Sequence, residues 1–219
     1  MKRLLTLICL LLFVTTVQAQ NKPLTPDVTR IAEGKGWKLV NRMATAVEED
    51  GRKAIRFDEK TGQGLAWVES SNFDQGVIEV DIKGKNDLQR SFVGVAFRGV
   101  DEKTHDAVYF RPFNFKSEDP VRRIHAVQYV SHPTYTWQKL RTEKNGQYEK
   151  AVNPVPDPDG WFHARIVVAN RKISVFVNGA KEPSLVVEEL SDRKGGLVGL
   201  WVGEGSGGAF ANLKITLEK

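Results

Sequence analysis

The sequence predicts an all-β fold, a two-sheet antiparallel β-sandwich. Eleven short runs rich in β-branched and aromatic residues recur along the chain, and turn-forming residues such as Asn-Gly pairs separate them. Within the runs, hydrophobic residues alternate with polar ones, which is typical of antiparallel sheets with one buried and one solvent-facing side. So many strands in one chain require two sheets that pack face to face.

The N-terminal segment has the pattern of a secretory signal. Two basic residues precede an apolar run, residues 4–14, and a small residue, Ala19, ends the segment. The run is too short to span a bilayer as a membrane helix. We therefore expect cleavage after Ala19, a secreted or periplasmic protein, and no membrane insertion of the mature chain. Residues 20–36 are polar and are expected to lead into a single domain, residues 37–219.

Composition and charge exclude several classes of function. The chain has 219 residues and one cysteine, Cys9, which lies in the predicted signal. The mature protein would then have no disulfide and no cysteine metal site. The formal net charge is +5, and the basic residues are scattered among acidic ones. This distribution gives no basic patch for nucleic acid or for an anionic membrane.

The predicted strands follow one another from residue 54 onward. They are residues 54–57, 65–69, 76–83, 91–98, 107–113, 124–130, 137–143, 161–168, 173–177, 197–202 and 210–217. Residues 169–172 are predicted to turn one hairpin, and Asn178-Gly179 supplies the positive φ of the next turn. No helical period stands out beyond a single turn near residues 188–192.

Several segments resemble a known superfamily. "WFHARIVVANRKISVFVNG" (161–179) and "GGLVGLWVGEGSGGAFANLKI" (195–215) are similar to the C-terminal half of concanavalin A-like lectin/glucanase domains, which include laminin G-like jelly rolls. "FDQGVIEVDIKG" (73–84) resembles an early strand of the same domains. The resemblance implies a concanavalin A-like jelly roll. It does not fix the function, because this fold hosts lectins, glycanases, adhesion modules and structural domains.

Within this superfamily, two further segments resemble secreted bacterial domains related to the 3-keto-disaccharide hydrolases. They are "VYFRPFNF" (108–115) and "AVQYVSHP" (126–133). This resemblance implies a concave sheet face that is used for sugar. Many lectins of the fold also use calcium, but "PDPDG" (156–160) offers a single Asp-x-Asp-Gly, which a plain turn explains as well. No cofactor is therefore expected.

Glu79 and Asp81 are the first candidates for catalysis. They alternate with apolar residues, so both carboxylates face the same side of a strand. A retaining glycosidase needs two carboxyl groups about 5–5.5 Å apart, and residues two apart on a strand could approach this. The stretch resembles the E-x-D-x-E strand of family-16 glycoside hydrolases, but the final Glu is missing. The two residues are therefore either catalytic or ordinary solvated or salt-bridged sheet residues.

Arg111 and Asn114 are candidates for sugar binding. Pro112 cannot donate to a β-ladder, so the strand is at an edge or disrupted there. By alternation, Arg111 shares a face with Tyr109. A guanidinium fork beside an aromatic ring suits hydroxyl-rich or anionic sugars. The alternative is a structural Arg111 that pairs with the carboxylates of strand 76–83.

Residues of the segment 126–141 could complete a sugar site: Gln128, His132, Tyr135, Trp137 and Arg141. Aromatic rings stack on the apolar faces of sugars, and amides fix hydroxyl groups. As alternatives, Tyr135 and Trp137 could cap the core, and His132 could simply be exposed. Arg98 follows Gly94 and Ala96 on one strand, where small residues either leave room for a ligand over the sheet or permit close packing.

Three functions are compatible with these patterns. The leading hypothesis is a secreted protein that binds glycan on the concave sheet face through the polar and aromatic cluster. The second is an enzyme that cleaves glycosidic bonds, with Glu79 or Asp81 as general acid or base and Arg111 holding the substrate. The third is a structural or adhesive module that binds another protein.

Overall fold

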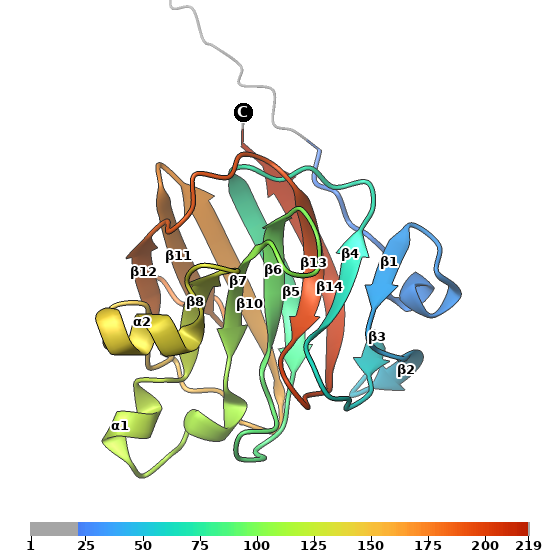
Figure 1. Ribbon diagram of the computed structural model, residues 1–219. Helices are drawn as coiled ribbons and strands as arrows, with labels where there is room; N and C mark the ends of the chain where they lie inside the picture. The colour runs from blue at the N-terminus through green and yellow to red at the C-terminus, as the bar shows by residue number, and fades with distance from the viewer. Residues whose placement is uncertain (1–21, 219) are drawn as a thin grey trace, which may run out of the picture.

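The computed structural model describes residues 22–218, and it confirms the predicted β-sandwich. Two antiparallel seven-stranded sheets pack face to face (Figure 1). The first sheet contains, in spatial order, β1 (Trp37–Val40), β4 (Gly64–Val68), β13 (Leu197–Val202), β6 (Val93–Gly99), β7 (Asp106–Phe110), β8 (Val127–Ser131) and β9 (Glu149–Lys150). The second contains β12 (Leu185–Glu188), β11 (Lys172–Val177), β10 (Trp161–Ala169), β5 (Gly76–Lys83), β14 (Gly208–Leu217), β3 (Arg52–Phe57) and β2 (Ala44–Glu49).

The core between the sheets follows the predicted alternation. On β5, Ile78, Val80 and Ile82 are fully buried, whereas the residues between them are only partly buried on the outer face. The predicted hairpin is also confirmed, since β10 and β11 pair directly around Asn170 and Arg171, both at positive φ. Strand β14 lies in the middle of the second sheet, hydrogen-bonded to β5 on one side and β3 on the other.

Several elements differ from the prediction. The predicted strand at residues 137–143 is wrong, because this segment is helix α2 (Trp137–Glu143). The Thr136 hydroxyl caps it by accepting a hydrogen bond from the Lys139 amide at 3.4 Å. The strand predicted from residue 124 starts only at Val127, because helix α1 (Pro120–Arg123) precedes it. Strands β1, β2, β9 and β12 were not predicted.

The segment before residue 37 packs onto the sandwich. Helix η1 (Val28–Glu33) is a 3₁₀ helix that Asp27 caps, and it buries Val28 and Ile31 in the core. The predicted signal peptide falls outside the described residues, so export stays a prediction. None of the helices in residues 22–218 has the length and apolar character needed to cross a membrane.

The first sheet departs from the expectation of one solvent-facing side. Its outer face carries a second apolar cluster, separate from the core between the sheets, and α2 packs over it through Leu140. Close packing explains the small residues of β6. A Cβ atom at Gly94 would lie 2.2 Å from the Val108 carbonyl oxygen and 2.6 Å from the Tyr109 Cα atom. The covered outer face of this sheet positions the site described next.

Candidate functional site

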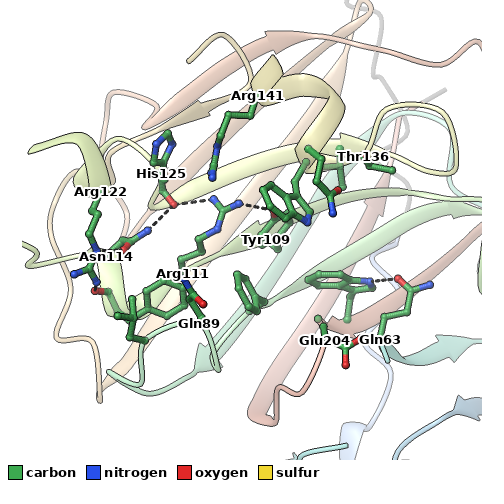
Figure 2. A pocket seen from close by; sticks show the side chains of 18 of the residues that line it. Gln63, Gln89, Tyr109, Arg111, Asn114, Arg122, His125, Thr136, Arg141 and Glu204 are labelled. Carbon is green, nitrogen blue, oxygen red and sulfur yellow. Dashed lines mark hydrogen bonds between the residues drawn. The ribbon is translucent and has the colours of Figure 1, made fainter. Parts of the chain in front are cut away.

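A pocket of about 790 Å³ lies on the outer face of the first sheet (Figure 2). Its lining comes from β13, the segment before β6, the end of β7, the α1 region and α2, so segments far apart in the sequence meet there. Helix η2 (Pro112–Asn114) turns the chain away directly after β7 and borders the pocket. The pocket has the size of a small-molecule or sugar site.

Aromatic side chains form the floor of this pocket. Tyr109 and Trp201 lie on neighbouring parts of the sheet, with ring centroids 5.0 Å apart. Phe92 packs edge-on against Tyr109 at 6.2 Å. The Trp201 indole donates a hydrogen bond to Gln63 Oε1 at 3.1 Å, which fixes the ring (Figure 2). The ring planes of Tyr109 and Trp201 are tilted by 43°, so the floor is an inclined, rigid aromatic surface.

Arg111 packs against the Tyr109 ring of this floor. Because Pro112 ends the strand, Arg111 leaves the β-ladder and turns its guanidinium over the Tyr109 ring, 4.8 Å from the centroid. It donates to the Tyr109 hydroxyl at 2.7 Å and to the His125 carbonyl at 2.8 Å (Figure 2). It also donates to Gln128 Oε1. These bonds hold the guanidinium in one orientation.

A buried carboxylate, Glu149, organises the basic side of the pocket. It lies 2.8 Å from His125 Nδ1, 3.0 Å from the Arg141 guanidinium and 3.4 Å from that of Arg111. Burial lowers the pKa of His125, and the nearby Glu149 carboxylate opposes this effect. One carboxylate is therefore shared by two guanidiniums and lies beside the imidazole.

Trp137 and Arg122 stand on different walls of the pocket. Trp137 is 42 % exposed, and the Arg141 guanidinium stacks over its ring at 5.1 Å. Arg122, from α1, donates to Asn114 Oδ1 and to the Phe113 carbonyl, each at 3.3 Å. The pocket thus combines a rigid aromatic floor, an exposed indole and several planar donors.

A family comparison agrees with this architecture. The model of the 3-keto-alpha-glucoside-1,2-lyase-like domain matches residues 27–216. The chain belongs to this family. Among curated proteins, none matches the sequence.

Solved structures with low sequence identity share the fold of this family member. A protein of unknown function with a galectin-like fold from Bacillus subtilis has 10 % identity and a TM-score of 0.58, covering 90 % of this chain and 97 % of its own. The carbohydrate binding module CBM66 from Bacillus subtilis has 16 % identity and a TM-score of 0.57, covering 83 % of this chain and 96 % of its own. A structure described as a native glycosidic hydrolase has 13 % identity and a TM-score of 0.57, covering 93 % of this chain and 99 % of its own.

Most of the residues predicted to bind sugar meet at the pocket. Five of them line it: Arg111, Asn114, His132, Trp137 and Arg141. Gln128 lies buried beneath the pocket, where its side-chain oxygen accepts a hydrogen bond from the Tyr109 hydroxyl at 2.6 Å. Tyr135 does not line the pocket but packs against the outer apolar cluster, with Lys139 over its ring at 5.4 Å.

His132 connects the pocket to a second, buried histidine. Burial and the neighbouring Arg193 lower the pKa of His132. Its ring lies 5.1 Å from that of His105. Burial, together with the adjacent His132, lowers the pKa of His105 to about 3. Both imidazoles are therefore neutral at pH 7.

Arg98 lies apart from the pocket in a buried ion cluster. Its guanidinium is fully buried and bonds to Glu189 Oε1 at 2.8 Å and to the Asp74 carbonyl at 2.7 Å. Asp106, also fully buried, lies 3.8 Å from it and bonds to the Ser191 hydroxyl at 3.0 Å. The ion pairs and hydrogen bonds of this cluster link the segment after β12 to the start of β7.

Glu79 and Asp81 lie on the outer face of the second sheet and do not line the pocket. Asp81 contacts His163 Nδ1 at 2.8 Å and accepts from Asn212 at 2.7 Å. Glu79 pairs with Lys214 at 2.8 Å. Both carboxylates therefore have ion-pair partners on neighbouring strands.

The Asp81–His163 pair gives a pH-dependent contribution to stability. The hydrogen bond to Asp81 raises the pKa of His163. Burial acts to raise the pKa of Asp81, but the bonds from His163 and Asn212 outweigh it and lower this pKa. The His163 contribution is full below about pH 6.5 and is lost as pH rises through its raised pKa. The Asp81 contribution is present above about pH 3.9 and is lost as pH falls through its lowered pKa.

We expect an NMR titration to show a His163 pKa above 6.5, the usual value, and the substitution Asp81→Asn to move it downward. The titration of His125, far from this face in the fold, serves as the internal control and stays unchanged. A His163 pKa at or below 6.5 in the unmodified protein would contradict the pairing.

No cluster of three or more His, Cys, Asp or Glu side chains in residues 22–218 is arranged to hold a metal ion. In the "PDPDG" segment, the Gly160 amide bonds to the Asp157 carbonyl at 3.1 Å, which closes a turn. The Asp159 carboxylate is engaged by the Asn86 amide at 2.8 Å.

Sequence reasoning did not single out several residues of the site. They are Gln63, Phe92, His125, Trp201 and Glu204 in the lining, and Glu149 behind it. Trp201 carried one available signal, since it alternates with core residues on β13 and so had to face outward. Glu149 carried no signal, because it follows a turn and resembles an exposed residue.

Proposed function

We propose that this protein binds a carbohydrate in the pocket on the outer face of the first sheet. The observation that carries the proposal is the combination of fixed aromatic rings, Tyr109 and Trp201, with an exposed indole, Trp137, in one pocket. Rings of this kind stack on the apolar C–H faces of sugars, while Arg141 and Asn114 supply donors for hydroxyl groups. The name of the family, which refers to a keto-glucoside, supports a sugar ligand. Among the structural neighbours, the carbohydrate binding module adds support of the same kind.

We propose cleavage of a 3-keto glycoside as the second candidate, because the family name describes a lyase-like domain. A ketone at C3 acidifies the hydrogen at C2, so a base can remove that proton while the C1–O bond breaks and the leaving group departs. His125 suits the base: the Glu149 carboxylate lies 2.8 Å from Nδ1, and the lowered pKa leaves the ring neutral at pH 7. The sequence-based alternative, with Glu79 and Asp81 as the acid and base, would require a second site on the opposite face of the sandwich.

The two candidates are separated by incubating residues 20–219 with glycans and 3-keto glycosides, then measuring binding by calorimetry and products by mass. Intact ligand with measurable affinity supports binding alone. A new keto-sugar that disappears with His125→Ala supports cleavage in this pocket, whereas one that disappears only with Glu79→Gln places it on the other face. If the protein shows no measurable affinity and forms no product with any of these compounds, the proposal is overturned.

We expect Trp137→Ala to weaken sugar binding about tenfold, because it removes a stacking surface worth about 1.4 kcal/mol. The matched control is Trp161→Ala, since Trp161 lies on β10 of the other sheet, where Arg52 stacks over it at 5.4 Å. This control is expected to leave the affinity unchanged. Equal losses in both variants, measured by calorimetry, would contradict the location of the site.

A further inference from the structure

We propose that the pocket prefers a carbohydrate with a carboxylate substituent, and that Arg122 binds this group. The inference rests on the proposed sugar-binding function and adds a substrate class to it. Arg122 is half-buried on α1 and lines the pocket beside Asn114 and Phe113 (Figure 2). It differs from the other guanidiniums of the pocket in having no acidic partner.

The contacts of Arg122 leave part of its guanidinium unused. Its Nε donates to Asn114 Oδ1 and its Nη2 to the Phe113 carbonyl, both at 3.3 Å and both to neutral acceptors. No carboxylate in the described part of the chain lies within 4 Å of it. A guanidinium has five N–H donors, so donors remain for a ligand.

The other two guanidiniums of the pocket already have a carboxylate partner. Arg111 and Arg141 share the buried carboxylate of Glu149, at 3.4 Å and 3.0 Å. The lining itself contains one further carboxylate, Glu204. Three guanidiniums and two carboxylates leave an excess of one positive charge, and of the three guanidiniums Arg122 is the one without a carboxylate within 4 Å in residues 22–218.

The position of Arg122 suits a substituent at the edge of a bound sugar. It also lines a smaller neighbouring pocket of about 540 Å³, so it stands where the two pockets meet. The lining of the smaller pocket includes two carboxylates, those of Glu118 and Asp119, which disfavour a bound anion on that side. Asp119 is engaged by the Val121 amide at 2.8 Å, and Lys116 lies 3.9 Å from Asp157. An anion is therefore favoured on the side of the larger pocket.

A planar carboxylate matches the fork of a guanidinium, because two parallel N–H···O bonds can form. A charge-assisted contact of this type is stronger than a contact to a neutral hydroxyl group. Because the Arg122 side chain is already held by Asn114 and Phe113, binding would cost little additional ordering of the side chain.

The test compares methyl glucosides, the corresponding methyl glucuronides, and methyl glucoside 6-sulfate by ligand-detected NMR titration at low and high salt. We expect the glucuronide to bind about tenfold more tightly than the glucoside. Arg122→Gln is expected to remove this preference while changing glucoside affinity by less than about twofold. The matched control is Arg123→Gln, because Arg123 is the next residue of α1 and lines neither pocket.

The outcomes separate this inference from the proposed function. Binding of the glucoside with no gain for the glucuronide overturns the inference and leaves the proposed function intact, whereas no binding of any sugar overturns both. If the protein prefers the glucoside 6-sulfate but not the glucuronide, the pocket binds a different oxyanion. This result overturns the proposal that the ligand carries a carboxylate. If Arg122→Gln does not fold, Arg122→Lys keeps the charge without the fork, and an undiminished preference in that variant would exclude bidentate recognition.

Discussion

Glu149→Ala is expected to lower the free energy of unfolding by about 3–5 kcal/mol, because it leaves the buried Arg111 guanidinium without its counter-charge. Glu149 is 2 % exposed and holds Arg111 at 3.4 Å and Arg141 at 3.0 Å. Without the carboxylate, the two guanidiniums repel each other beside the pocket floor. Sugar binding is therefore expected to be lost together with stability. Urea unfolding followed by tryptophan fluorescence measures the first effect, and calorimetry measures the second.

The control for this prediction is Glu143→Ala, on α2, where the side chain is exposed and lies 4.0 Å from Lys139. Surface pairs of this kind contribute about 0–1 kcal/mol, so this variant should stay close to the unmodified protein. A loss below 1 kcal/mol for Glu149→Ala would show that Arg111 and Arg141 do not depend on this carboxylate.

Arg98→Met is expected to destabilise the fold by a similar amount, about 3–5 kcal/mol, because it leaves Glu189 buried without its cation, whereas Asp106 keeps its ion pair with Arg193. Arg98 is 0 % exposed and Asp106 is 0 % exposed, so water cannot replace the lost contacts. Removing one partner of a buried pair is costly, whereas removing both with apolar residues is much less so. The double variant Arg98→Met with Glu189→Leu is therefore expected to be more stable than Arg98→Met alone, as measured by urea unfolding.

The comparison variant is Arg171→Met, which removes an exposed pair with Asp192 at 3.0 Å and should cost less than about 1 kcal/mol. Strictly additive losses in the double variant would contradict an energetic coupling between Arg98 and Glu189. Unchanged sugar affinity in a folded Arg98 variant would agree with its position away from the pocket.

The sequence was informative wherever local alternation decides the structure. The strand Gly76–Lys83 and the hairpin around Asn170 were predicted because apolar residues at every second position can face only one side. Helix α2 was not predicted, because its single buried residue, Leu140, gives no period. The usable signal was Thr136, a capping residue followed by the helix-favouring residues of 138–141.

The site was predicted in part for the same reason. Arg111, Asn114 and His132 come from segments that flank two neighbouring strands, β7 and β8, so sequence neighbours become spatial neighbours. Trp201 and Gln63 reach the pocket only through the pairing of β13 with β4 and β6, which no short stretch of sequence reveals. Glu149 is buried by contacts with residues before it in the chain, and its burial depends on the complete fold.

The central place of β14 in the second sheet also bears on the order of folding. This strand, Gly208–Leu217, pairs with Gly76–Lys83 and Arg52–Phe57, so the sheet cannot close until distant parts of the chain have met. Closing such long loops is entropically costly, and chains dominated by distant contacts fold slowly. Residues 22–207 alone lack the strand that joins the two halves of the sheet, so β5 and β3 are connected within the sheet only when residues 208–217 are in place.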